Sequence, residues 1–412
     1  MSEHHDTVIV GGGQAGLAMS YHLRQRGREH VILERGRIAD RWRNERWKSL
    51  RFQFPNWSIQ LPGSPYTGAD PEGFAHFTEI VHFIDTYAAN INAPVKEGTE
   101  AISVSRESSE KSYLVETRSG NISTRNVIIA TGPFQSPYIP SFGRHIPSSV
   151  FQVSASQYKS PDQLPPGAVL VVGSGASGCQ IADELHHAGR TVYLSASRHR
   201  RVPRRYRGKD MFWWSQKLGR FDITIDAFPD RKYPPSTVVT GVRGGYDLDL
   251  RQFARDGVRI IGHVRGVSEG AFSLASDAAE ILEEADKANA AFISAADELA
   301  ARSDLNSLLE AAGDHRDLGT SPGISQLEEL DLRIANIGSV VWATGHRFDF
   351  SWVRLPIFDT HGVPIQKRGI SNCEGVYFLG LHWMQTFKSG LLSFVGDDAA
   401  YLADYMERNL LG

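Results

Sequence analysis

The sequence predicts an α/β protein built from two similar strand–turn–helix units, with the second unit inserted into the first. Two glycine-rich stretches predict these units: VIVGGGQAGLAMSYHL at residues 8–23 and LVVGSGASGCQIADEL at residues 170–185. In each, an apolar run typical of a buried parallel strand leads through small residues into a segment with helical apolar spacing. Two later stretches, NVIIATG at 126–132 and SVVWATGH at 339–346, mirror each other in the same way.

Both stretches have the spacing G-x-G-x-x-G, formed by Gly11, Gly13, Gly16, Gly173, Gly175 and Gly178. In such a turn the first glycine permits a tight bend, the second lets the backbone approach a pyrophosphate, and the third lets the helix pack closely on the strand. The phosphates then lie at a helix N-terminus, where free N–H groups and the helix dipole favour anions. Two copies in matching context predict two Rossmann-like dinucleotide-binding domains.

The strand that follows each glycine turn distinguishes the two sites. Residues 31–33 lead to Glu34, whose carboxylate would accept hydrogen bonds from an adenosine ribose, and this suits FAD or NAD. The corresponding run at 191–194 ends at Ser195, without an acid, and leads into a basic loop. This loop contains six arginines within ten residues: Arg198, Arg200, Arg201, Arg204, Arg205 and Arg207.

Guanidinium groups bind phosphate through several directed hydrogen bonds, so the basic loop suits the 2′-phosphate of NADPH. We expect Arg198 and a neighbour to bind it; a solvated basic loop and a nucleic-acid patch are the alternatives. One site should therefore hold FAD, and the other should receive NADPH as hydride donor. The residues expected at the cofactors from these motifs are Gly11, Gly13, Gln14, Ala15, Gly16, Glu34, Arg35, Thr131, Gly132, Gly173, Ser174, Gly175, Ala176, Ser177, Gly178, Ser197, Arg198, Thr344 and Gly345.

Length and charge limit the class of protein. A chain of 412 residues can bury a large core and would divide into two or more domains. Its net charge of −3 argues against a nucleic-acid or membrane-surface protein, and no apolar run approaches the length of a membrane span. The first strand is expected to begin at about Thr7, which leaves no room for a signal peptide, so the cytoplasm is the expected location.

The two cysteines, Cys179 and Cys373, are far apart in the sequence. They exclude a disulfide framework and any CxxC redox pair. Electrons must therefore go to a substrate, to oxygen, or to both. Cys179 lies inside the second predicted helix, where packed core is the expected role. No metal site is expected.

We expect three consecutive parts. These are the FAD-binding domain at 1–159, the NADPH-binding domain at 160–325, and the return of the first domain at 326–412. The stretch SPDQLPPG at 160–167 indicates a linker at the first boundary. GVYFLG at 375–380 predicts a buried strand that rejoins the first domain, and GDDAAYLADYMERNL predicts a terminal helix.

The first domain also contains less regular sequence. A segment rich in tryptophan and proline follows Glu34 and predicts irregular structure, and a helix is expected around 79–90. The stretches AISVSRES and SYLVETRSG alternate and predict a hairpin or small sheet.

An acidic, alanine-rich insertion is expected from about 277 to 317. It contains 11 acidic residues against three Lys or Arg, with apolar residues at helical spacing. Two helices joined near 301–304 are predicted, as an acidic solvated pair covering the second domain. A partner-binding surface and a lid are the alternatives.

Taken together, these motifs resemble the flavin-containing monooxygenases, more closely their bacterial and plant YUCCA-like members; many bacterial members are labelled potassium-transport flavoproteins. The resemblance rests on the two G-x-G-x-x-G turns, the two ATG turns, the tryptophan-rich segment and the absence of CxxC, and it spans most of the chain. It implies that NADPH reduces FAD, that NADP⁺ stays bound, and that O2 adds to flavin C4a. The resulting peroxyflavin would oxygenate a nitrogen, a sulfur or a carbonyl carbon of a small organic substrate, chemistry that belongs to the cofactor.

The sequence departs from that family at two motifs. A family signature with the core His-Ser-x-x-Tyr reads SASQY here, so Tyr158 fits but Ser154 and Ala155 replace the histidine and the serine. The family pattern Ser-Leu-x-x-Asn-x-Pro occurs at residues 49–55 with Gln53 in place of the asparagine. The resemblance makes Gln53 the candidate catalytic residue, and an ordinary loop glutamine is the alternative.

The resemblance also implies residues around the flavin. Trp42, Trp47 and Trp57 would wall it, although such residues also form cores. The stretch LHWMQTFKSG follows the strand expected beside the flavin, and it supplies the substrate-side candidates His382, Trp383, Gln385 and Lys388.

Two other functions remain open from the sequence. One keeps both cofactors without oxygen insertion, as an NADPH-dependent reductase or dehydrogenase or a peroxide-releasing oxidase. The other is a non-catalytic nucleotide sensor that regulates a transporter. The expected partners are O2 and a small organic molecule, with no nucleic acid or membrane, and a homodimer is the common default.

Overall fold

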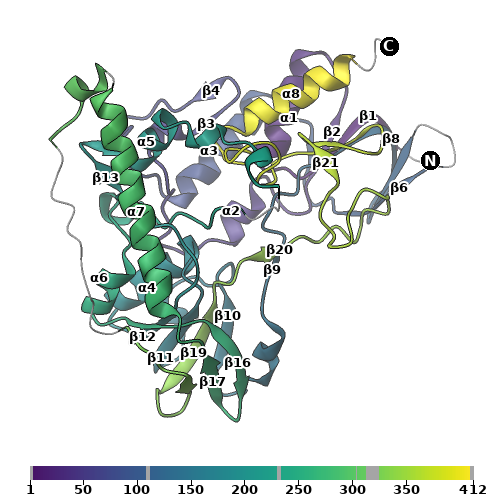
Figure 1. Cartoon of the computed structure of the whole chain (residues 1–412). Helices are drawn as coiled ribbons and strands as arrows, with labels where there is room; N and C mark the ends of the chain where they lie inside the picture. The colour runs from purple at the N-terminus through teal and green to yellow at the C-terminus, as the bar shows by residue number, and fades with distance from the viewer. Residues whose placement is uncertain (1–2, 108–111, 230–232, 303, 312–323, 409–412) are drawn as a thin grey trace.

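The computed structural model describes residues 3–107, 112–229, 233–302, 304–311 and 324–408. Two sheets, each with helices packed on it, form the two parts of the molecule (Figure 1). Nine strands form the first sheet, with the order β21-β22-β23-β8-β1-β2-β5 and with β6 and β7 continuing from β8. These strands are β1 Glu3–Val10, β2 Val31–Leu33, β5 Val95–Lys96, β6 Ala101–Arg106, β7 Tyr113–Thr117, β8 Gly120–Ile129, β21 Gln366–Lys367, β22 Ile370–Ser371 and β23 Val376–Phe378.

The second sheet has five strands, all parallel, in the order β10-β19-β11-β12-β15. They are β10 Phe151–Ser154, β11 Ala168–Val172, β12 Val192–Ser195, β15 Arg259–Ile261 and β19 Ile337–Trp342. Both β10 and β19 lie outside the expected range of 160–325. Strand β19 covers the open edge of β11, whose residues are all buried, and β10 then pairs with β19. We therefore propose a wider second unit, from about 151 to 342.

The structure also has smaller sheets. Strands β16 Val264–Ser268, β17 Ala271–Leu274 and β18 Glu329–Asp331 form an antiparallel sheet. Three two-stranded pairs are β3 Gln60–Leu61 with β4 Ser64–Pro65, β9 Ser136–Pro137 with β20 His346–Arg347, and β13 Arg205–Tyr206 with β14 Lys209–Asp210. The β9–β20 pair lies between the two large sheets in Figure 1.

The helices confirm several of the expectations. They are α1 Gln14–Gln25, α2 Asp40–Asn44, α3 Phe77–Asn90, α4 Ala176–His187, α5 Met211–Lys217, α6 Leu250–Arg255, α7 Ala278–Ala301 and α8 Val395–Arg408. The two helices after the glycine turns, the helix near 79–90 and the terminal helix are present as predicted. The hairpin β6–β7 is also present, and β23 rejoins the first sheet beside β8. Helix α2 was not predicted; it lies in the segment expected to be irregular.

The acidic insertion differs from its prediction. The structure has one continuous helix, α7, of 24 residues, followed by a short 3-10 turn at Asp304–Leu308. The first expected helix is present and ends at Ala301, where the joint was predicted, but up to residue 311 the second is only a 3-10 turn, so the prediction of a second α-helix is wrong for the described residues. The remainder of the expected insertion, 312–317, lies outside the described residues.

One face of α7 belongs to the protein core. Its N-terminal half contributes Ile281 and Leu282 to the core of the second sheet. Its C-terminal half contributes Phe292 and Ala296 to an aromatic cluster that also contains Phe212 of α5. Figure 1 shows α7 running along one side of the molecule past α5, α4 and α6. The helix therefore ties two parts of the core together.

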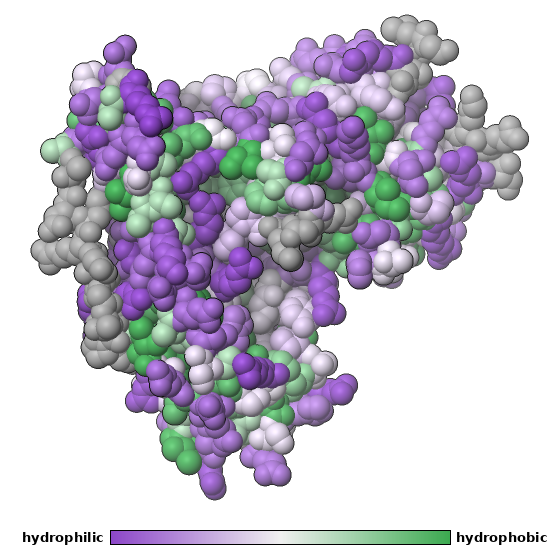
Figure 2. Space-filling view, viewed as in Figure 1, coloured by the Kyte–Doolittle hydropathy of each residue, from purple (hydrophilic) through white to green (hydrophobic). Residues whose placement is uncertain are grey.

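The surface does not indicate a large apolar docking face in the view shown. Figure 2 shows a mostly hydrophilic face with small, separate hydrophobic patches. Within the part of the chain that the structure describes, no helix is both long enough and apolar enough to cross a lipid bilayer.

The packing of α7 predicts a large cost for truncating Phe292, whose side chain is completely buried. We expect Phe292→Ala to lower the free energy of unfolding by about 3–5 kcal/mol, because it removes apolar contacts and leaves a cavity. Urea denaturation followed by circular dichroism measures this. Glu298→Ala, at an exposed position of the same helix, is the control and should change stability by about 0.5 kcal/mol or less. Equal effects of the two substitutions would contradict this packing.

Candidate cofactor and substrate site

The first glycine turn lies between β1 and α1. Gly11 has φ +117°, and a Cβ there would lie 2.5 Å from the Ala130 carbonyl oxygen. A Cβ on Gly16 would overlap the Gly11 carbonyl oxygen, so the helix can approach its strand only with glycine. Gly13 caps α1, with no side-chain hydrogen bond at the cap and with open space where its Cβ would lie. No side chain caps the first amides of α1, and a helix N-terminus of this kind suits a pyrophosphate.

Glu34 lies at the end of the neighbouring strand, β2, as the sequence predicts. Its carboxylate is 8% exposed and accepts hydrogen bonds from the backbone N–H groups of Gly12 (2.8 Å) and Gly36 (2.9 Å). These contacts hold the carboxylate beside the glycine turn. Arg35, the next residue, is exposed. The position of Glu34 suits a ribose with two hydroxyl groups.

The second glycine turn repeats the first. Gly173 has φ +102°, and a Cβ on Gly178 would overlap the Gly173 carbonyl oxygen. Ser174 is buried, and its hydroxyl donates to the Ser197 carbonyl at 2.9 Å and accepts from the Ser197 N–H at 2.8 Å. Two of the expected cofactor residues, Ser174 and Ser197, thus join the turn to the loop after β12. That connection places the basic loop directly beside the second turn.

The basic loop divides into two groups. Four of its arginines have partners: Asp249 and Asp286 for Arg201, Asp210 for Arg204, the Gly244 carbonyl for Arg205, and Asp297 for Arg207. Among the described residues, the side chains of Arg198 and Arg200 have no hydrogen bond or ion pair. Arg198 is exposed, and Arg200 is half-buried with its pKa lowered by desolvation. These two guanidinium groups are available to an anionic ligand.

The two ATG turns meet at a small aromatic group. Phe134 follows the first ATG turn, His346 follows the second, and His382 follows β23. The ring centroid of Phe134 lies 5.2 Å from those of both histidines. Burial lowers the pKa of both imidazoles. The His382 side chain is exposed, and the His346 side chain is partly buried. We refer to Phe134, His346 and His382 as the junction.

The expected threonines of the ATG turns have protein contacts. Thr344 donates its hydroxyl hydrogen to the Tyr138 carbonyl, and Thr131 accepts a hydrogen bond from the Gln135 amide at 3.0 Å. Gly132 and Gly345 both have positive φ, of +73° and +87°. The threonine hydroxyls therefore fix the conformations of the two ATG turns. The residues that follow these turns, Phe134 and His346, form part of the junction.

Only one of the three tryptophans lies next to a nucleotide turn. Trp42 donates its indole N–H to the Gln14 side chain at 3.4 Å, and Gln14 in turn donates to the Gly390 carbonyl at 2.8 Å. Trp47 is 5% exposed and packs in the core of the second unit, and Trp57 packs on Phe212 at 5.4 Å. Trp47 and Trp57 thus have the core packing that the sequence left as the alternative.

Sequence reasoning missed Arg46, which lies beside Trp42. Its guanidinium carbon is 4.8 Å from the centroid of the Trp42 ring. Burial lowers the pKa of Arg46 to about 10. The spacing of the two residues within RWRNERW was the available signal, but it did not show that the arginine folds over the ring.

Three of the four substrate-side candidates contact the second unit. Lys388 forms an ion pair with Asp222 at 2.9 Å. The Gln385 carbonyl accepts a hydrogen bond from the Ile225 N–H at 3.0 Å. Trp383 has φ +53° and stacks on Tyr233, with ring centroids 4.8 Å apart. These residues hold the loop after β23 against the segment after α5, and only His382 lies at the junction.

The altered family signature serves as a connector. The Tyr158 hydroxyl donates to the Glu184 carboxylate of α4 at 2.7 Å, and Ser49 donates to the same carboxylate at 2.6 Å. Ser154, at the histidine position, bonds to Gln157 at 2.9 Å. Glu184 was not predicted as a functional residue, because its role depends on Tyr158 and Ser49, which are distant in sequence. It fixes the start of the segment that contains Gln53.

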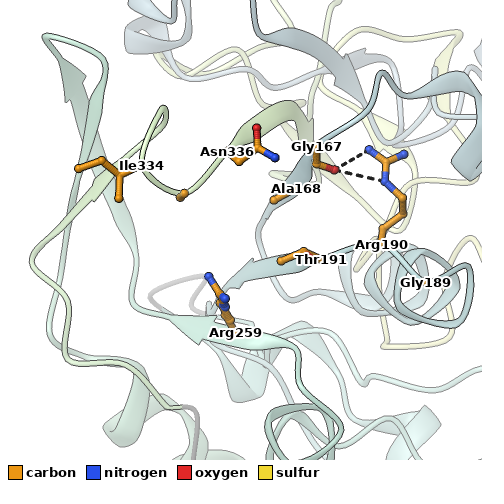
Figure 3. A pocket seen from close by; sticks show the side chains of 9 residues that line it. Gly167, Ala168, Gly189, Arg190, Thr191, Arg259, Ile334 and Asn336 are labelled. Atoms are coloured by element: carbon orange, nitrogen blue, oxygen red, sulfur yellow. Dashed lines mark hydrogen bonds between the residues drawn. The ribbon is translucent and has the colours of Figure 1, made fainter.

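A cavity of about 490 Å³ lies at the opposite edge of the second sheet. Figure 3 shows Arg190 at its side, donating to the Gly167 carbonyl at 2.9 and 3.3 Å. Ala168 begins β11 and Arg259 begins β15, so the cavity lies at the amino ends of the strands. Ligands of open parallel sheets bind at the carboxyl ends, so this cavity is separate from the cofactor sites.

Comparison with known proteins agrees with the two-nucleotide arrangement. Residues 8–210 match the sequence family described as pyridine nucleotide-disulphide oxidoreductase. The chain is 34% identical over 404 residues to an uncharacterized CzcO-like oxidoreductase of Geobacillus kaustophilus, covering 96% of this chain and 97% of that protein. It is 30% identical over 217 residues to YUCCA3 of Arabidopsis thaliana, described as a probable indole-3-pyruvate monooxygenase, covering 50% of this chain and 49% of that protein.

A solved structure shows the same fold over the full length. A flavin-containing monooxygenase from Stenotrophomonas maltophilia superimposes with a TM-score of 0.66 at 19% identity, covering 99% of both chains. At this identity the likeness concerns the fold. The full-length match at 34% identity carries the family assignment.

The junction histidines predict a stability change in mild acid. Their folded-state pKa values lie below the 6.5 of an unperturbed histidine. As the pH falls through 6.5, the unfolded chain therefore binds protons that the folded chain does not, and the free energy of unfolding decreases until the folded pKa is passed. We expect the double variant His346→Gln/His382→Gln to lose less stability than the parent between about pH 7 and pH 5, measured by urea unfolding.

The control for this experiment is His361→Gln, at an exposed turn. It should follow the pH dependence of the parent chain. A double variant that also follows the parent would show that protonation of the junction does not oppose folding.

Proposed function

The chain belongs to the flavin-containing monooxygenase family and is an NADPH-dependent flavoprotein enzyme with FAD, and from this premise we propose that it transfers one oxygen atom of O2 to a small organic substrate. The oxygenated atom would be a nitrogen, a sulfur or a carbonyl carbon, the last in a Baeyer–Villiger reaction. NADPH, a proton, O2 and the substrate then give NADP⁺, water and the oxygenated product.

The observation that carries this proposal is that the chain has no cysteine pair that could accept electrons from the flavin. Two nucleotide turns lead to one junction, and the chain's two cysteines, Cys179 and Cys373, are both buried and unpaired. Cys179 lies inside α4, and burial raises its pKa, which keeps the thiol protonated. No dithiol can therefore accept electrons from a reduced flavin, as a disulfide reductase requires. Oxygen is the acceptor that the remaining chemistry favours.

The residues present fit both cofactors. The open first turn, the Glu34 carboxylate and the Gln14–Trp42 contact suit FAD, which supplies the oxygen chemistry when bound. The second turn and the unpartnered Arg198 and Arg200 suit NADPH. The assignment of individual side chains to these cofactors is part of the proposal.

The protein's own contribution would be at the junction. Neutral His346 and His382 flank Phe134, so the space between the turns contains no acid or ammonium group from these three residues. We infer that Gln53 would donate an amide hydrogen bond to the oxygen-bearing group. The segment after α5 closes the loop after β23 and would exclude water from this space.

One observation favours a second function, a peroxide-releasing oxidase. Gln53 extends one methylene farther than the asparagine that the family pattern contains, and its side chain has no hydrogen bond within the described part of the chain that fixes its orientation. A loosely held amide would protect the oxygenated cofactor less well. In that case NADPH, a proton and O2 would give NADP⁺ and hydrogen peroxide.

The two functions differ in the destination of the oxygen atoms. With FAD-loaded protein we would measure NADPH consumed, hydrogen peroxide released and ¹⁸O from labelled O2 in product, using panels of amines, thioethers and ketones. We expect one panel to give ¹⁸O-labelled product with less peroxide than NADPH consumed. Stoichiometric peroxide with every panel and no labelled product would support the oxidase. No oxidation of NADPH at all would refute both.

The basic loop predicts the nucleotide preference. We expect Arg198→Ala to raise KM for NADPH about tenfold or more while leaving KM for NADH unchanged, because one charge-assisted contact to the 2′-phosphate is lost. Steady-state kinetics with the two nucleotides measures this. Arg205→Ala is the matched control, since Arg205 is exposed and bonds to the Gly244 carbonyl. Equal losses with NADPH and NADH would place Arg198 away from the 2′-phosphate.

A further inference from the structure

Arg204 is the one arginine of the basic loop that is directed into the protein. Its side chain is 2% exposed, although it lies only six positions after Arg198. It donates from Nε and Nη2 to the Asp210 carboxylate at 2.9 and 2.5 Å. The remaining nitrogen, Nη1, donates to the backbone carbonyl of Gln53 at 2.7 Å. A side chain of the second unit thus holds the turn that carries the candidate catalytic amide.

The surroundings of this contact leave little freedom. The Arg204 guanidinium lies 4.4 Å from the centroid of the Phe74 ring. Gly241 approaches Phe52 so closely that a Cβ would overlap the Phe52 carbonyl oxygen. The Phe52 N–H donates to the Ala75 carbonyl at 2.7 Å. The Gln53 turn is therefore held on one side by the segment around residue 75 and on the other by Arg204.

Stability alone does not account for a buried arginine at this position. Burying an ion pair costs desolvation energy, and an apolar side chain of similar volume often serves as well. The pair with Asp210 uses Nε and Nη2 and leaves Nη1 for one directed bond. We therefore attribute the buried arginine to the need to hold the Gln53 carbonyl in one position, and not to a net gain in stability.

The same loop carries the two arginines that have no partner. Between Arg198 and Arg204 the backbone is held at Arg200, whose N–H donates to the Ser236 carbonyl and whose carbonyl accepts from the Val238 N–H. A nucleotide that binds Arg198 and Arg200 would restrict the loop further. A ligand shifts the conformations of a loop only when it binds one of them more tightly, and the 2′-phosphate would favour conformations in which Arg198 and Arg200 both reach it.

We propose that Arg204 is a positioning residue that transmits nucleotide binding at the basic loop to the turn carrying Gln53. This inference depends on one part of the proposed function, the binding of NADP⁺ at the basic loop. With the nucleotide bound, Arg204 holds the Gln53 carbonyl and with it the direction of the Gln53 amide. Without the nucleotide the same contacts form, but they open more often. Arg204 itself does not contact the substrate or the cofactors.

The test is amide hydrogen exchange of the FAD-loaded protein with and without NADP⁺, followed in peptides that cover residues 50–57. In the parent we expect NADP⁺ to slow exchange there about tenfold, the factor that one charge-assisted hydrogen bond provides. In Arg204→Lys we expect NADP⁺ to bind as in the parent but without this slowing. Lysine keeps a charge for Asp210 but ends in one nitrogen, which cannot also span the distance to the Gln53 carbonyl.

Arg205→Lys is the matched control and should keep the parent's response to NADP⁺. As a second readout, Arg204→Lys should release more hydrogen peroxide per NADPH than the parent does. If NADP⁺ still slows amide exchange of residues 50–57 in Arg204→Lys, the proposal is overturned. It is also overturned if NADP⁺ does not slow this exchange in the parent chain. The second outcome can be measured even if the variant does not fold. Loss of NADP⁺ affinity in Arg204→Lys would instead make Arg204 part of the nucleotide site. A parent that does not bind NADP⁺ would refute the proposed function together with this proposal.

Discussion

The close approach of a helix to the turn before it is the constraint on which the rest of this structure depends. Gly16 and Gly178 lie so near the carbonyl oxygens of Gly11 and Gly173 that any side chain would collide with them. This contact brings the N-terminus of each helix to the carboxyl end of its strand, where unpaired amides can bind phosphate. Because the constraint occurs twice, the molecule has two nucleotide sites whose ATG turns lead to one junction.

Residues from the second unit then fix how the two sites face each other. Asp222 pairs with Lys388, the Ile225 N–H bonds to the Gln385 carbonyl, and Arg204 reaches the Gln53 carbonyl. Two of these contacts end on the loop that contains His382, and the third ends on the Gln53 turn. The loops next to the flavin are therefore shaped by both units. This arrangement suits a reaction in which the bound nucleotide must stay while a reactive intermediate is protected from water.

The sequence predicted the features that depend on local patterns. The glycine spacing, the apolar strands and Glu34 follow from short-range rules, and they lie where those rules place them. We propose wider bounds for the second unit than the sequence predicts, because β10 and β19 join its sheet from outside the range 160–325. Trp47 and Trp42 have similar sequence surroundings, yet Trp47 is core of the second unit and Trp42 contacts the first nucleotide turn. Such differences arise from tertiary contacts between distant segments, which a periodic pattern does not encode.

The acidic insertion shows most clearly what the sequence could not reveal. Read alone, its acids predicted a solvated helical face, and the six arginines of the basic loop predicted a phosphate site. In the structure these charges partly neutralise each other, since Asp286 and Asp297 of α7 pair with Arg201 and Arg207 across long stretches of sequence. This pairing removes two arginines from the proposed phosphate site, and Asp210 and the Gly244 carbonyl engage two more. Of the six arginines, Arg198 and Arg200 alone have no side-chain partner among the described residues, so α7 and the other partners narrow the guanidinium groups that could bind a phosphate.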